Sequence, residues 1–93
     1  MPDQVVRLAT PAAVVRAIRA ADSLEEFGRR ARRDLERREK GLADEGLRID
    51  RSNCTKARAI RQAATDAVFA HPEWADEVAA TLKAAKKRSE DAA

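Results

Sequence analysis

Side chains that carry most enzyme chemistry are scarce in this sequence of 93 residues. It has one cysteine, one histidine, no tyrosine and three scattered glycines. Cys54 has no partner for an internal disulfide, which suits a reducing compartment. Cys54 and His71 together fall short of the three or four ligands that zinc requires. The sequence therefore predicts a protein that is not an enzyme and that has no metal site and no cofactor.

Long apolar runs are also missing. No uncharged stretch approaches the roughly 18–20 residues of a transmembrane helix. The opening Met1-Pro2-Asp3 lacks the charged and then apolar layout of a signal peptide. We therefore expect a cytoplasmic protein with neither a membrane partner nor a small-molecule substrate. Arginine outnumbers lysine by 14 to 5, which is typical of GC-rich coding DNA in bacteria and their phages.

Large apolar side chains are few as well. Leu, Ile, Val, Phe and Trp together supply 18 of the 93 residues, whereas alanine alone supplies 21. Alanine favours helix but adds little to a core. A chain of this length already buries only about 60–65% of its unfolded surface. We expect a helical domain that is completed by a partner protein or by a second copy, as a homodimer.

Helix boundary signals predict an all-α fold, a small bundle of about four helices of unequal length. The expected helices cover about residues 10–21, 24–40, 53–70 and 73–88. Thr10 and Pro11 are typical of a helix start, and Ser23 with Glu26 forms a capping box. Ser52 is expected to cap the third helix, after a connector at residues 46–51.

The expected organisation is one domain with two flexible ends. Residues 1–9 are predicted to form an N-terminal arm, residues 10–88 a single helical domain and residues 89–93 a frayed tail. Apolar residues at helical spacing predict the core. They are Val14, Ile18 and Ala21; Leu24, Phe27, Ala31 and Leu35; Ala57, Ile60, Ala64, Ala67 and Val68; and Trp74, Val78, Ala79 and Leu82. Leu47 and Ile49 of the connector are expected to join this core.

Charge is unevenly distributed along residues 24–40. Arg29, Arg33 and Arg37 form a row at a spacing of four residues, in which like charges repel one another. Such a row is favoured by an acidic partner surface or by a phosphate backbone. The alternative is a solvated helix surface in which Glu26 pairs with Arg30 and similar pairs stabilise the helix.

A second cationic segment, residues 51–61, contains no acidic residue. Its candidate nucleic-acid-binding residues are Arg51, Ser52, Asn53, Lys56, Arg58 and Arg61. At a helix N-terminus, free backbone N–H groups and such side chains would form an anion site. The alternative is that these cations simply occupy exposed helical positions.

Residues 42–58 bear a partial resemblance to a helix-turn-helix. Leu42 and Ala43 followed by Gly46 would end one helix, and Ser52 with Asn53 would open a recognition helix. The connector at 46–51 is longer than the three or four residues of the usual turn. The resemblance implies a DNA-binding role for the second cationic segment.

Two functions are compatible with this sequence. The first is a non-catalytic regulatory protein that binds and modulates a partner protein, as small bacterial or phage accessory and inhibitor proteins do. The alternative is a small dimeric DNA-binding transcriptional regulator that uses residues 51–61. Trp74 is of a type that anchors interfaces, and it lies near acidic residues. The candidate partner-binding residues are Arg29, Arg33, Arg37, Trp74, Asp76 and Glu77.

Overall fold

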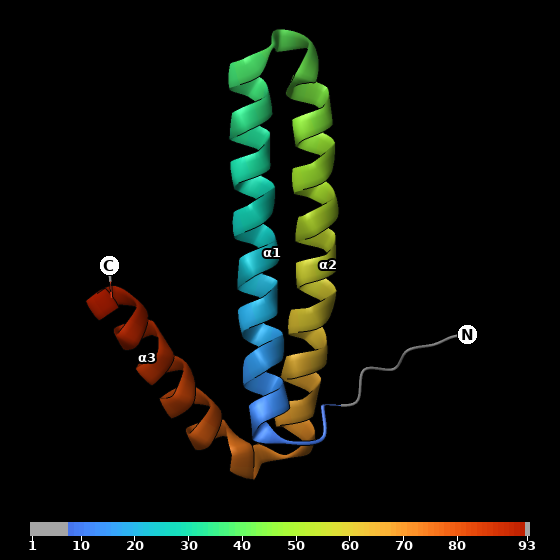
Figure 1. The fold of residues 1–93 in the computed structure, drawn as a ribbon. Coiled ribbons are helices and arrows are strands. Elements are labelled where there is room, and N and C mark those ends of the chain that lie inside the picture. Colours follow the sequence, from blue (N-terminus) through green and yellow to red (C-terminus); the bar gives the residue numbers. More distant parts are fainter. Residues whose placement is uncertain (1–7, 93) are drawn as a thin grey trace.

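A computed structural model describes residues 8–92 as an antiparallel helical hairpin with a third helix at its base (Figure 1). The hairpin consists of α1 (Pro11–Arg38) and α2 (Ala43–Ala70), joined at the tip by the short 3₁₀ helix η1 (Lys40–Leu42). A second 3₁₀ helix, η2 (Pro72–Trp74), leads into α3 (Ala75–Ala92). No strand occurs within residues 8–92, so the all-α prediction is confirmed. The arm predicted at residues 1–9 lies almost wholly outside the described residues.

The first two predicted helices are one continuous helix, α1, so the break predicted near Ser23 is wrong. Thr10 caps α1 as predicted, because its Oγ1 accepts a hydrogen bond from a backbone N–H at 3.1 Å, and Pro11 occupies the first turn. The helix continues through Ser23 because small residues contact α2 on both sides of it. Ala21 before it and Gly28 after it are both buried.

The connector predicted at residues 46–51 is helical as well. Because α2 begins at Ala43, Ser52 lies inside the helix and does not cap one. Residues 46–51 therefore contain no turn of a helix-turn-helix. Gly46 resembles a helix breaker in the sequence, but the structure buries it against α1. At the other end, α3 continues to Ala92, beyond the predicted end at 88.

The two long helices meet along positions spaced alternately four and three residues apart, as in a coiled coil. This contact line consists of Val14, Ile18, Ala21, Glu25, Gly28, Arg32 and Leu35 on α1, and of Gly46, Asp50, Asn53, Ala57, Ile60, Ala64 and Ala67 on α2. Alanines at positions 21, 57 and 64 are at most 2% exposed. Small side chains therefore occupy most of the buried positions, which lets the helices approach closely.

Two glycines mark the closest approach of the helices. A Cβ atom added to Gly46 would lie 3.0 Å from the Cα atom of Arg32, and one added to Gly28 would lie 3.1 Å from Cβ of Asn53. Both separations are shorter than ordinary van der Waals contact. The backbones of α1 and α2 thus touch where no side chain intervenes.

The apolar core lies at the base of the hairpin, where α3 packs. It is built from Val14, Val15, Ala64 and Val78, and Trp74 and Leu82 are among the residues packed against it. Most core positions predicted in the first, third and fourth apolar stripes are confirmed. Ala79 is exposed instead, and Leu47 and Ile49 are only partly buried and lie outside this core. The second stripe is only partly correct, because Phe27 is 64% exposed. Its ring lies outside the contact line, one position before the buried Gly28.

We expect Gly46→Ala to lower the free energy of unfolding by up to about 2 kcal/mol. The added methyl group would force the helices apart, at about 1–3 kcal/mol, and the higher helix propensity of alanine offsets about 1 kcal/mol of this. Urea unfolding followed by circular dichroism at 222 nm measures the change.

The matched control is Gly41→Ala, because no atom lies within 4 Å of the added Cβ and this glycine has no positive φ. Its stability should stay the same or rise by about 0.4–1 kcal/mol. Equal effects of the two substitutions would contradict a close approach at Gly46.

Candidate functional site

The contact line divides the hairpin into two sides. On one side Arg61 of α2 reaches across to Asp22 and Glu25 of α1. Val15 and Val68 lie seven residues from Asp22 and Arg61, so the helical repeat places them on the same side. Both valines belong to the region where α3 packs. The side that carries Arg61 is therefore also the side that α3 covers at the base.

Arg61 and its two carboxylate partners form the most extensive ion-pair group between the helices. The guanidinium contacts Glu25 through two bonds, from Nη1 to Oε2 at 2.7 Å and from Nη2 to Oε1 at 2.6 Å. Nη2 also donates to Oδ1 of Asp22 at 2.5 Å. The hydrogen bond from Arg61 holds the pKa of Glu25 below its usual value, and the carboxylates raise the pKa of Arg61. This group links α1 to α2 in one register.

The six candidate nucleic-acid-binding residues do not share one surface. Arg61 is held by α1, and Asn53 is buried, with its Nδ2 donating to the carbonyl oxygen of Leu24 at 3.0 Å. The other four are exposed. Lys56, however, lies about 140° around the helix from Arg51. The free N–H groups expected near residue 52 are also absent, because α2 begins at Ala43.

The arginine row lies on the outer surface of α1, and all three side chains are exposed. Arg29 pairs with Glu26 at 3.3 Å, and Arg37 lies 3.9 Å from Asp34. Arg33 makes no ion pair within the described part of the chain. The row is therefore partly neutralised by acidic residues of its own helix.

The other three candidate partner-binding residues lie at the base of the hairpin, away from Arg33 and Arg37 near the tip. Trp74 packs against the core and stacks on the ring of His71, with centroids 4.0 Å apart. Asp76 and Glu77 are exposed in the first turn of α3, where their negative charges interact favourably with the helix dipole and stabilise the helix. The two halves of the predicted partner-binding set are not brought together.

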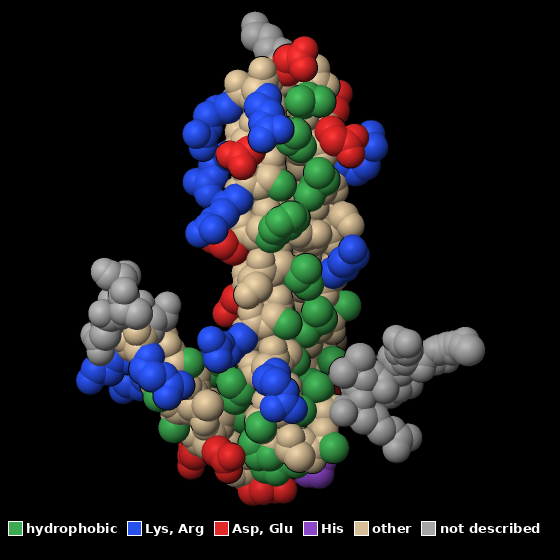
Figure 2. Space-filling model, viewed as in Figure 1, with side chains coloured by type: hydrophobic (Ala, Val, Ile, Leu, Met, Phe, Trp, Pro, Cys, Tyr) green, Lys and Arg blue, Asp and Glu red, His purple; other side chains and the backbone are tan. Residues whose placement is uncertain are grey.

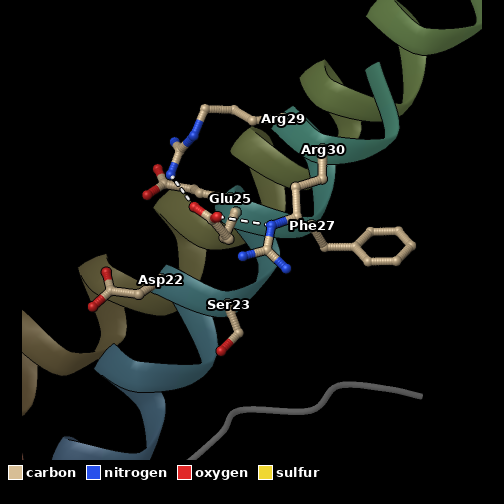
Figure 3. A pocket seen from close by; sticks show the side chains of 7 residues that line it. Asp22, Ser23, Glu25, Phe27, Arg29 and Arg30 are labelled. Carbon is tan, nitrogen blue, oxygen red and sulfur yellow. Dashed lines mark hydrogen bonds and ion pairs between the residues drawn. The ribbon is translucent and has the colours of Figure 1, made fainter. Parts of the chain in front are cut away.

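An open hollow of about 600 Å³ lies beside α1 along residues 22–30 (Figure 3). Glu26 accepts hydrogen bonds there from Arg29 at 3.3 Å and from Arg30 at 2.9 Å, which confirms the predicted pair with Arg30. The same contacts lower the pKa of Glu26, chiefly through Arg29. Phe27 points away from this charged group (Figure 3). All lining residues belong to one helix, so the hollow is a solvated surface and does not enclose a ligand.

The side of the hairpin opposite Arg61 carries mostly small and apolar side chains. This surface is named the open face, and the helical repeat assigns twelve positions to it. They are Ala17, Ala20, Leu24, Phe27, Ala31 and Asp34 on α1, and Ile49, Ser52, Lys56, Ala59, Ala63 and Asp66 on α2. None of the twelve is buried. Figure 2 shows hydrophobic side chains following the hairpin on the side toward the viewer.

Sequence reasoning missed the open face because it assigned Phe27 and Leu24 to the core. The signal that could have located it is the seven-residue spacing of Ala21, Gly28 and Leu35. This spacing defines a contact line that leaves Phe27 and Leu24 to one side of it.

Within the described residues, Cys54 and His71 do not lie close enough together to form a catalytic or metal-binding pair. Cys54 is half-buried, with its Sγ 3.7 Å from Oδ1 of Asp50. His71 lies at the end of the same helix, 17 residues after Cys54 and about 25 Å away along the helix axis, so these two residues do not form a pair. Within residues 8–92 no group of three or more potential ligands could hold a metal ion.

No protein-family model matches this chain, and neither the curated proteins nor the solved structures contain a significant match. None of the helices within residues 8–92 has both the length and the apolar character needed to cross a bilayer.

The ion pairs of Arg61 make a testable contribution to pH dependence. The pKa of Glu25 is lower in the folded chain than its usual value of 4.5, so ionisation of this carboxylate favours folding. This stabilisation is present above pH 4.5 and is lost as pH falls through the lower, folded-state pKa. We expect Arg61→Gln to unfold more readily at pH 7 and to lose less stability between pH 6 and pH 3.

Thermal unfolding followed by circular dichroism across that pH range measures the effect. Arg51→Gln is the matched control, because Arg51 is exposed and makes no ion pair within the described residues. The role of the Arg61 group is contradicted if both variants follow the wild-type pH profile.

Proposed function

We propose that this chain is a non-catalytic, cytoplasmic helical protein that binds and modulates a partner protein through the open face of its hairpin. The observation that carries the proposal is the 64% exposure of Phe27 on a surface built mainly of alanine, leucine and isoleucine. Exposed apolar surfaces of this kind mark protein interaction sites. The partner surface it fits is one or two amphipathic helices that present an apolar stripe.

The packing properties of the open face support a helical partner. Alanines at positions 17, 20, 31, 59 and 63 leave shallow grooves in which larger side chains of another helix can lie. Phe27 projects from this surface and supplies an aromatic anchor, the residue class that dominates many interfaces. Charge steering supports the same proposal, because Arg37 adds a cation on the outer surface of α1 near the rim of this face.

Phe27→Glu is expected to reduce partner binding by at least tenfold, because it places a charge in the centre of the proposed interface. The measurement is quantitative affinity capture from cell extract, with the chain as bait. Helical circular dichroism should be unchanged, because Phe27 makes no contribution to the contact line.

Phe69→Glu is the matched control. Phe69 is the other exposed aromatic residue, at 78% exposure, and it lies on α2 about 28 Å along the axis from Asp50, the residue beside Gly28. The Phe69→Glu variant should capture the same proteins as the wild type. A partner retained by Phe27→Glu and lost from Arg33→Glu/Arg37→Glu would assign binding to the arginine row instead.

The alternative function, a dimeric DNA-binding regulator, has weaker support. Only Arg51 and Arg58, seven residues apart on α2, share one side of the helix among the exposed cations of residues 51–61. We expect no micromolar binding to a random-sequence duplex in fluorescence anisotropy at low salt. Binding that weakens steeply with salt and is lost in Arg51→Gln/Arg58→Gln would favour this alternative.

A further inference from the structure

We propose that the occupant of the open face is a second copy of this chain, so that two hairpins form a four-helix bundle. This inference rests on the interaction surface of the proposed function and names the partner. It requires that the open face be uncovered in one copy, that the face suit self-association, and that one copy gain stability from a second.

The hairpin is a single layer of helices over most of its length. Domains are built from at least two packed layers, because each helix must bury its apolar side. The third helix supplies a second layer only at the base, on the side of Val15 and Val68, and then diverges from α1 (Figure 1). The open face thus lacks a second layer within the described residues.

The composition of the open face suits a two-fold interface, in which the same patch occurs on both copies. Charged residues make up 38% of the chain but only three of the twelve positions, namely Asp34, Lys56 and Asp66. Two patches that each carried several charges of one sign would repel each other, whereas this patch carries few charges and both signs. Lys56 can extend its ammonium group to the edge while its methylenes cover apolar surface.

The thin core of one copy favours a permanent partner, such as a second copy, over a transiently bound protein. Its buried hydrophobic residues are three valines and three alanines, namely Val14, Val15, Ala21, Ala57, Ala64 and Val78. A core of this size contributes little to stability, and small helical proteins commonly gain the missing part by oligomerisation. A second copy is present whenever the protein is, and it stabilises the fold more as the protein concentration rises above the dissociation constant of the dimer.

Sedimentation equilibrium between 1 and 100 µM tests the proposal on the full chain. We expect the wild type to have twice the monomer mass of 10.3 kDa and a melting temperature that rises with protein concentration. Phe27→Glu should halve the mass and remove the concentration dependence. The control Phe69→Glu should remain dimeric.

A second variant tests the same face independently, in case Phe27→Glu fails to fold. Ala20→Glu also places a charge on the open face, at an exposed position with a small side chain, and should halve the mass with unchanged helicity. The proposal is overturned if the wild type is monomeric at 100 µM, or if both charged variants remain dimers.

The outcomes also separate this inference from the proposed function. A monomeric wild type whose captured partner is lost in Phe27→Glu would overturn self-association and support a different partner. A wild type that dimerises through the open face and captures no other protein in a Phe27-dependent way would support self-association and contradict the modulation of a separate partner.

Discussion

The other features of the hairpin follow from how closely α1 approaches α2. At Gly46 and Gly28 the helices are so close that an added Cβ atom would lie 3.0 and 3.1 Å from its nearest neighbour, so the packing would have to shift to admit a side chain. Close contact of this kind replaces the large interlocking side chains of an ordinary coiled coil with backbone packing. Because small residues occupy most of the buried positions between the helices, the larger apolar side chains are left on the flanks.

Polar residues within the contact line fix how the helices align. Arg32 pairs with Asp50 at 3.3 Å, Asn53 donates to a backbone carbonyl, and Arg61 binds Glu25. Alanine and glycine alone would tolerate a shift along the axis, since their surfaces are uniform. Each polar pair can form in one register only. Buried polar residues specify the register of other helical assemblies in the same way.

The same arrangement explains why the two sides of the hairpin differ. One side is closed, by α3 at the base and by ion pairs across the middle. The other carries Leu24, Phe27 and Ile49 among alanines and presents an apolar surface to solvent. A helical pair of this kind gains most in buried apolar area from a second pair of helices packed on its open side.

Local sequence signals are enough to predict the all-α class, the helix start at Thr10 and most core residues of the base, because alanine content, capping chemistry and apolar spacing act locally. The same signals predict helix breaks near Ser23 and Gly46 that do not occur, since capping residues and glycine indicate helix ends only when no neighbouring helix stabilises their continuation. They place Phe27 in the core for a related reason: spacing defines a stripe but not which stripe meets the second helix. The contact line passes one position away, at Gly28, and that choice follows from the packing of the two helices because it depends on how closely their backbones can approach.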